Sequence, residues 1–252
     1  MKELFHIWLL TACLVGLILG NPAVAGASEK PGRKGLAKEA VATKNPVHKL
    51  SPEELAQLLE RTEKEFGKIQ SLFTDFIQEK HLEIFTRPVV ARGRCIFQNP
   101  GKMRFEITEP FQSVLIVNDK AVAKYELVES TWQKLQSSQQ QLVLLIIDHI
   151  TLWLQGRLRG KDDIYAISAE KGETTKVILT PRNEGFRKHL TAIELVMNRD
   201  ETGLRQLILR EPGQDYTVVT FINDRRNITI PPEVFNTNSP EPPPIPDGLA
   251  AP

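Results

Sequence analysis

The stretch that decides the fold lies at residues 99–107 and reads NPGKMRFEI. Its first three residues favour a tight turn, and from residue 102 onward apolar and charged side chains alternate. The apolar side chains are Met103, Phe105 and Ile107, and the charged ones are Lys102, Arg104 and Glu106. The alternation predicts an antiparallel strand with one face in water and one face against apolar groups. Met and Phe suit an ordinary core as well as an irregular cavity, so the pattern leaves both open.

Runs of similar length lie on both sides of this stretch and are separated by turn-forming residues. The predicted strands are 72–81, 89–98, 102–107, 114–118 and 122–128, then 164–170, 176–180, 189–197, 204–210 and 216–222. Short turns without regular intervening helices predict a meandering antiparallel sheet. The expected fold class is α+β, mainly β.

An amphipathic helix is predicted to precede the strands. Ser51 is a good N-cap, Pro52 fits the first turn, and Glu54 completes a capping box. Apolar residues then recur at helical spacing from Leu55 to Ile69, so one side of this helix needs a partner surface.

A second helix is predicted between the two sets of strands, at residues 142–154. The segment reads LVLLIIDHITLWL and is followed by Gln155-Gly156, a typical helix end. Its apolar residues cover most of the helical circumference, which indicates a helix buried on nearly all sides. A helix between a sheet and a ligand cavity and a plain core helix both satisfy this pattern. His149 within it is interpreted as a buried imidazole with a hydrogen-bond partner.

The ends of the chain are predicted to lie outside the globular domain, which spans residues 50–235. Residues 1–25 have the order of a cleaved secretory signal peptide, with Lys2, an apolar run and Ala23-Val24-Ala25, which predicts a periplasmic protein. An alternative is lipidation at Cys13, although the apolar run continues beyond it. Residues 26–49 are expected to form a flexible leader. Residues 231–252 hold eight of the seventeen prolines and are expected to be extended and solvated, with a disordered tail at 236–252.

Charge and motif content argue against nucleic-acid binding and catalysis. The 32 basic and 31 acidic residues nearly cancel, whereas nucleic-acid binders carry a basic patch. The sequence shows no phosphate loop, no nucleophile motif and no His or Cys pair at metal-ligand spacing. Cys95 lies in an apolar strand and is interpreted as a buried structural thiol. We therefore predict no enzyme activity, no metal and no cofactor.

The order of these features resembles the LolA family, the periplasmic carriers of outer-membrane lipoproteins. The resemblance covers roughly residues 50–235 and rests on a few short motifs. They are the capped helix, SLFTDFIQ at 71–78, NPGKMRFE at 99–106, LIVNDK at 115–120 and IPP at 230–232. The hairpin at 99–106 is the most specific of them.

The resemblance implies an incomplete antiparallel β-barrel, or half-barrel, with helices as a lid over an apolar cavity that holds acyl chains. Met103, Phe105 and Leu115 match apolar family positions implicated in contacts with cargo or partners, and Val117 joins them by strand parity. The segment 142–154 becomes the lid helix, so its cavity-facing positions are expected at Leu142, Leu145 and Ile146. Implied partners are an acylated lipoprotein or lipid, an inner-membrane releasing complex and an outer-membrane receptor, with the protein itself a monomer.

Two positions depart from the family pattern. Asn99 stands where many members have an Arg that latches the lid, and Phe105 replaces a common Trp. These departures favour a lipid-like cargo in general over a lipoprotein in particular. The main functional hypothesis is a carrier that shuttles acyl chains from the inner to the outer membrane. The alternative is a lipid- or lipoprotein-binding sensor of the same fold.

Overall fold

The computed structural model describes residues 47–119, 121–135 and 149–241. Their strands form one 12-stranded sheet in the order β1-β8-β9-β10-β11-β12-β2-β3-β4-β5-β6-β7. The strands are β1 His48–Lys49, β2 Ser71–His81, β3 Val89–Gln98, β4 Lys102–Glu109, β5 Ser113–Asn118, β6 Ala121–Val128, β7 Thr131–Leu135, β8 Tyr165–Lys171, β9 Thr175–Pro181, β10 Ala192–Met197, β11 Leu204–Arg210 and β12 Tyr216–Arg226. The helical elements include α2 Pro52–Phe66, α4 Glu184–Arg187 and the 3-10 helix η2 Pro232–Phe235.

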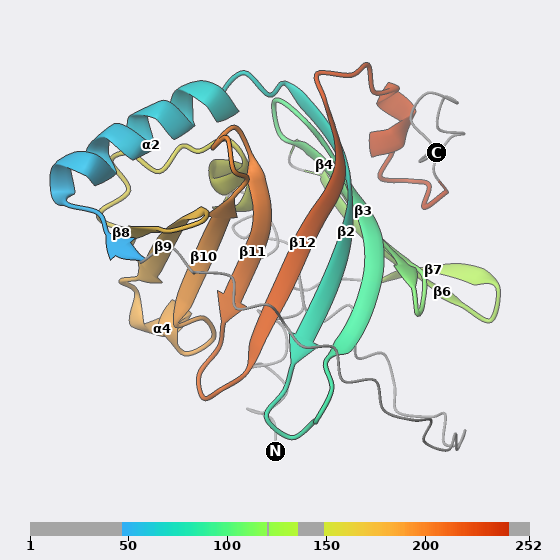
Figure 1. Cartoon of the computed structure of the whole chain (residues 1–252). Helices are drawn as coiled ribbons and strands as arrows, with labels where there is room; N and C mark the ends of the chain where they lie inside the picture. The colour runs from blue at the N-terminus through green and yellow to red at the C-terminus, as the bar shows by residue number, and fades with distance from the viewer. Residues whose placement is uncertain (1–46, 120, 136–148, 242–252) are drawn as a thin grey trace, which may run out of the picture.

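The sheet consists of two antiparallel meanders, β2 to β7 and β8 to β12. They join in the middle, where β12 pairs with β2 from Tyr216 opposite His81 to Arg226 opposite Leu72. The outermost strands, β1 and β7, do not pair with each other, so the strongly curved sheet stays open (Figure 1). The predicted fold class, a mainly β incomplete barrel with few helices, is confirmed.

Helix α2 begins where the sequence predicts. The Ser51 amide donates to Glu54 Oε2 at 2.8 Å, and the Glu54 amide donates to Ser51 Oγ at 3.3 Å, which completes the capping box. Its inward side buries Leu58, Leu59, Thr62 and Phe66. The helix lies across one end of the curved sheet, over the β8 to β12 half (Figure 1). It therefore closes that end of the interior.

The concave face of the sheet carries the main core. Apolar side chains from β2 to β5 and from β8 to β12 belong to one buried cluster, which also includes Trp153 and Leu158. Side chains from both halves of the sheet meet in one cluster because the sheet curves around them. On β4 the face contains Met103, Phe105 and Ile107, in the predicted alternation.

The convex face is covered in part by the C-terminal segment, which corrects two expectations. Arg104 and Glu106 were expected in water, but Arg104 is 1% exposed and Glu106 5% exposed. The Arg104 guanidinium pairs with Glu106 and donates to the carbonyls of Val234, at 3.2 Å, and of Pro240. Since the pair neutralises its own charge, burial is tolerated.

The start of the proline-rich tail is docked rather than solvated. Val234 and Phe235 of η2 are buried and form a second core cluster with Phe73, Ile96 and Ile230. Asn118 Nδ2 donates to the carbonyl of Phe235 at 3.2 Å, and the Tyr125 hydroxyl donates to the carbonyl of Thr237 at 2.9 Å. Residues 227–241 thus form a C-terminal strap on the convex face, next to β3 and β4 (Figure 1). The expected disordered tail falls partly on this strap, at 236–241, and its remainder, 242–252, lies outside the described residues.

Strand boundaries differ from prediction in several places, and the short strand β1, which pairs with β8, lies in the predicted flexible leader. The predicted strand at 189–197 begins only at Ala192, because the amides of His189 and Leu190 both donate to the carbonyl of Phe186 in the short helix α4, at 3.0 Å. Strand β7 was missed, and β12 extends past its predicted end at residue 222 to Arg226 through a bulge. The predicted signal peptide and most of the leader, residues 1–46, lie outside the described residues.

Candidate functional site

A small apolar cavity lies on the concave side of the sheet. It is lined by Leu72, Thr74, Cys95, Met103, Phe105, Leu115, Ile150, Trp153, Leu154, Leu204, Leu207 and Phe221. Apart from Thr74, every lining side chain is apolar or a thiol. Its free space is only about 30 Å³, enough for a water molecule but not for an acyl chain. The interior is therefore nearly closed in this conformation.

Three of the predicted cavity residues line this space. Met103, Phe105 and Leu115 are 2%, 6% and 3% exposed, and Phe105 lies opposite Leu115 in the register of β4 and β5. The Phe105 ring stacks on Phe76 with centroids 4.4 Å apart. Val117 lies on the same face and in the same core cluster, opposite Met103, but is not among the lining residues. Leu142, Leu145 and Ile146 lie outside the described residues.

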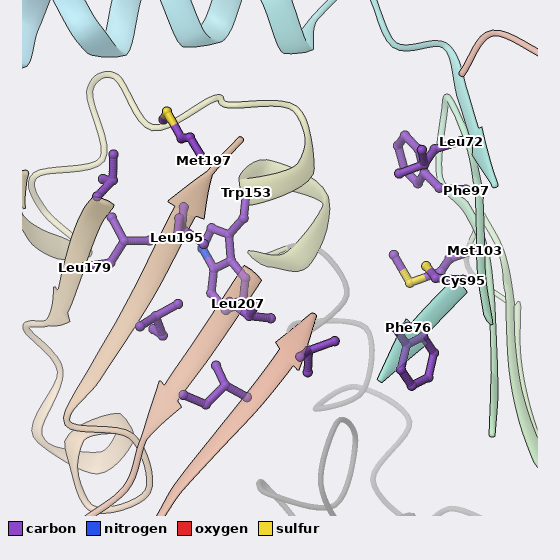
Figure 2. Packing of buried hydrophobic residues seen from close by; sticks show 14 of the residues in the cluster. Leu72, Phe76, Cys95, Phe97, Met103, Trp153, Leu179, Leu195, Met197 and Leu207 are labelled. Atoms are coloured by element: carbon purple, nitrogen blue, oxygen red, sulfur yellow. The ribbon is translucent and has the colours of Figure 1, made fainter. Parts of the chain in front are cut away.

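The opposite wall comes from a helical segment at residues 149–154. Ile150, Trp153 and Leu154 share one side of it because they are three and four residues apart. Trp153 is 4% exposed, and its indole lies over Leu195 and Leu207, facing the side chains of β2 to β4 across the interior (Figure 2). Trp153 therefore fills part of the interior between the two halves of the sheet.

The 149–154 segment ends in a Schellman motif. The Arg157 amide donates to the carbonyl of Leu152 at 2.9 Å and the Gly156 amide to that of Trp153 at 3.1 Å. Gly156 has a φ of 62°, and a Cβ there would come within 2.8 Å of Thr62 on α2. The predicted helix end at Gln155-Gly156 is thus confirmed, and it is packed directly on α2.

Asn99, the position of the family's latch arginine, contacts this segment through its side chain. Gln155 Nε2 donates to Asn99 Oδ1, and Asn99 Nδ2 donates to the carbonyl of Ile69 at 3.3 Å. A neutral pair of amides therefore joins the β3–β4 hairpin to the end of the 149–154 segment. Each such bond contributes a net stabilisation of only about 0.5–1.5 kcal/mol, which suits a contact that opens and closes.

His149 lies at the start of the segment, in an aromatic environment. Its Nδ1 is 2.6 Å from the Tyr165 hydroxyl, and its ring stacks on Phe186 with centroids 5.9 Å apart. Burial raises the pKa of Tyr165 above its ordinary value, so the phenol stays protonated. The imidazole is half-buried and hydrogen-bonded, in line with the structural role predicted for it.

Cys95 is part of the cavity wall and 5% exposed. Burial raises the pKa of its thiol to about 12, so the thiolate, which is the nucleophile, is not populated near neutral pH. Among the described residues, no group of three or more His, Cys, Asp or Glu side chains could hold a metal ion. In the same part of the chain, no helix is long and apolar enough to cross a membrane.

Sequence reasoning did not single out the cavity residues from the other strands. Leu72, Cys95, Leu204, Leu207 and Phe221 come from β2, β3, β11 and β12. Parity was the available signal for four of them, but Leu204 reaches the cavity through a bulge in the β10–β11 pairing that breaks its alternation with Leu207. Parity alone does not show which distant strands meet.

These features define a binding protein of the half-barrel class, an open sheet wrapped around an apolar interior. Residues 67–238 match the family model of the outer membrane lipoprotein carrier protein LolA, and the chain belongs to the LolA family. An outer-membrane lipoprotein carrier protein of Nitrosomonas europaea is 25% identical over 177 residues, covering 68% of this chain and 79% of that protein.

Solved structures show weaker similarity. A LolA superfamily protein of Nitrosomonas europaea has a TM-score of 0.40 at 10% identity, over 73% of this chain and 97% of that one. The MucA/MucB complex of Pseudomonas aeruginosa gives a TM-score of 0.41 at 14% identity, over 78% of this chain and 60% of that one.

Proposed function

We propose that the protein binds the acyl chains of a lipoprotein, or of a similar lipid, in its concave interior and carries them between the inner and outer membranes. The observation that supports this most is the lining of the cavity, where one partly closed space collects apolar side chains from both halves of the sheet. Acyl chains in water cost about 0.8 kcal/mol for each CH₂ group, so a carrier must cover them. No reacting group is needed for this task.

Cargo entry requires the 149–154 segment to move. The present space of about 30 Å³ cannot hold an acyl chain. Ile150, Trp153 and Leu154 are the lining side chains that this segment would carry away from the cavity. The Gln155–Asn99 contact would be broken on opening. Non-directional apolar walls suit chains of varied length, and a weak latch suits release to an acceptor.

The proposal places the mature protein in the periplasm after removal of residues 1–25. An inner-membrane complex would load it and an outer-membrane receptor would unload it. The second candidate is a sensor that binds the same acyl chains and keeps them. Asn99 favours it, because the arginine latch that many carriers of the family use is replaced by an amide.

Native mass spectrometry of protein isolated from its own periplasm tests binding. We expect a bound acylated species, and we expect it to be missing from protein expressed without residues 1–25, which never leaves the cytoplasm. A consistently empty periplasmic protein would contradict the proposal. Mixing loaded protein with outer-membrane vesicles then separates the two candidates, since a carrier transfers its cargo and a sensor retains it.

A further inference from the structure

The concave face contains a buried polar patch that the apolar cavity does not explain. Gln78 on β2 and Thr217 on β12 are each 0% exposed. Neither the amide nitrogen nor the amide oxygen of Gln78 has a hydrogen-bond partner, and the same is true of the Thr217 hydroxyl. Buried polar groups are nearly always hydrogen-bonded, so three unpartnered atoms on neighbouring strands require an explanation.

The register places both side chains inside the half-barrel. Gln78 lies between Val219 on β12 and Ala91 on β3, and both of these belong to the main core cluster. Thr217 lies opposite Leu209 of the same cluster. Thr217 is two residues from Val219, so it is a diagonal cross-strand neighbour of Gln78.

The patch lies on the same inward face as the cavity, further along β2. The inward residues of β2 are Leu72 and Thr74, which line the cavity, then Phe76, which stacks on the cavity residue Phe105, and then Gln78. At about 3.3 Å per residue, Leu72 and Gln78 are about 20 Å apart, a span comparable with a long acyl chain. Figure 2 shows Leu72 and Phe76 facing the interior from this strand. If one end of a bound acyl chain lies near Leu72, its other end reaches Gln78.

The charges near the patch favour a neutral ligand group. Lys80 is the next inward residue of β2, but its ammonium is already paired with Glu211, and both side chains are largely buried. A carboxylate would have to compete with Glu211 for that ammonium. A neutral carbonyl needs only the donors that Gln78 and Thr217 leave unused.

We propose that Gln78 and Thr217 bind the carbonyl group of the amide or ester that links an acyl chain to its head. This inference rests on the proposed function. The Gln78 amide nitrogen would donate to the carbonyl oxygen, and the Gln78 amide oxygen would accept from an amide N–H where the linkage has one. The site then fixes the depth to which the chain enters, while the apolar walls hold the chain itself.

The test compares three pyrene-labelled probes of equal chain length, a hydrocarbon, a methyl ester and an N-methyl amide. The wild-type mature chain is expected to bind the ester and the amide about tenfold more tightly than the hydrocarbon, the effect of about one net hydrogen bond. Gln78→Met keeps the size and removes both polar atoms, so it should bind all three alike without losing affinity for the hydrocarbon. The amide exceeding the ester would show that the Gln78 oxygen is used as well.

Gln206→Met is the matched control. Gln206 lies on the outer face of β11 and already donates to Thr220 Oγ1 at 3.0 Å, so its loss should leave the carbonyl preference unchanged. A wild type that binds hydrocarbon and carbonyl probes equally would overturn the inference and leave the proposed function intact. Binding of none of the probes would refute the proposed function itself.

Melting without ligand separates a ligand role from a structural one. If Gln78 has a structural role, Gln78→Met will lower the melting temperature and leave the preference unchanged, which overturns the inference. Should that variant not fold, Thr217→Val replaces one hydroxyl by a methyl group of similar size. It is expected to reduce the preference for the ester severalfold, and an undiminished preference there would equally overturn the inference.

Discussion

Replacing Trp153 by Ala tests whether this side chain plugs the interior that cargo must occupy. Trp153 is 4% exposed and, together with Ile150 and Leu154, forms the cavity wall that belongs to the 149–154 segment. Truncating a fully buried Trp costs about 3–5 kcal/mol of unfolding free energy, because packing is lost and a cavity remains. The wild type gives up part of this packing whenever cargo displaces the indole. The variant has already lost it, so we expect acyl binding that is at least about tenfold tighter, or about 1.4 kcal/mol.

Trp132→Ala is the matched control and also supplies a reporter. Trp132 on β7 is partly buried and packs against a small cluster on the convex face, away from the interior, formed by Val114, Ile116, Ala123 and Tyr125. Its truncation should cost less stability and leave acyl binding unchanged. Of the three Trp residues in the chain, Trp8 lies in the predicted signal peptide, so mature Trp132→Ala retains Trp153 alone.

The assay combines urea unfolding with titration of a fluorescent fatty-acyl probe. In the Trp132→Ala background, we expect the emission of Trp153 to shift to the red as the indole leaves the apolar interior. Weaker binding by Trp153→Ala would refute the plug and make the indole part of the wall that holds the chain. An emission maximum that stays fixed at saturation would refute it independently.

Four further changes test other parts of the structure. Phe105→Glu buries a carboxylate beside the cavity, so acyl-probe binding should be lost and the free energy of unfolding should fall by several kcal/mol. Unchanged binding would exclude Phe105 from the site. Asn99→Arg is expected to slow cargo transfer to acceptor vesicles, since a guanidinium can donate to several acceptors at once, and an unchanged rate would contradict the latch. Arg104→Met leaves the buried Glu106 with Arg94 as its remaining ion-pair partner and removes the donor to the carbonyl of Val234, so it should cost about 1–3 kcal/mol in urea unfolding, with faster hydrogen exchange at 230–241; an unchanged free energy of unfolding would contradict the buried pair. Cys95, whose pKa is raised to about 12, should stay unreactive to thiol reagents at pH 8 until the protein is unfolded, and rapid labelling of the folded protein would contradict its burial.

Local rules predicted the parts of this fold that depend on neighbouring residues. The capping box at Ser51 and the Schellman end at Gly156 each involve a few consecutive residues, and both are present. Strand parity likewise placed Met103, Phe105 and Ile107 on one inward face, whereas the assignment of Met103, Phe105 and Leu115 to the cavity wall came from the family resemblance.

Contacts between distant parts of the chain were not predictable in this way. Val234 and Phe235 follow two prolines and were grouped with the tail, because nothing local shows that the convex face is apolar at Phe73 and Ile96. Arg104 looked like a solvated charge for the same reason, since its partners come from the C-terminal strap. Leu207 and Phe221 line the cavity only because β12 pairs with β2, and the sequence of neither strand indicates which strand it pairs with.

The pairing of β2 with β12 has a consequence for how the chain acquires its structure. The middle of the sheet joins residues 71–81 to residues 216–226, so this central ladder closes only after nearly the whole chain is available. Loop-closure entropy must be overcome before such a ladder forms, which makes folding slow compared with that of a protein built from local contacts. Neither meander has a complete core alone, since the main cluster draws on both. We expect such a chain to stay unfolded until most of it is available, and an unfolded chain is what the export predicted from residues 1–25 would require.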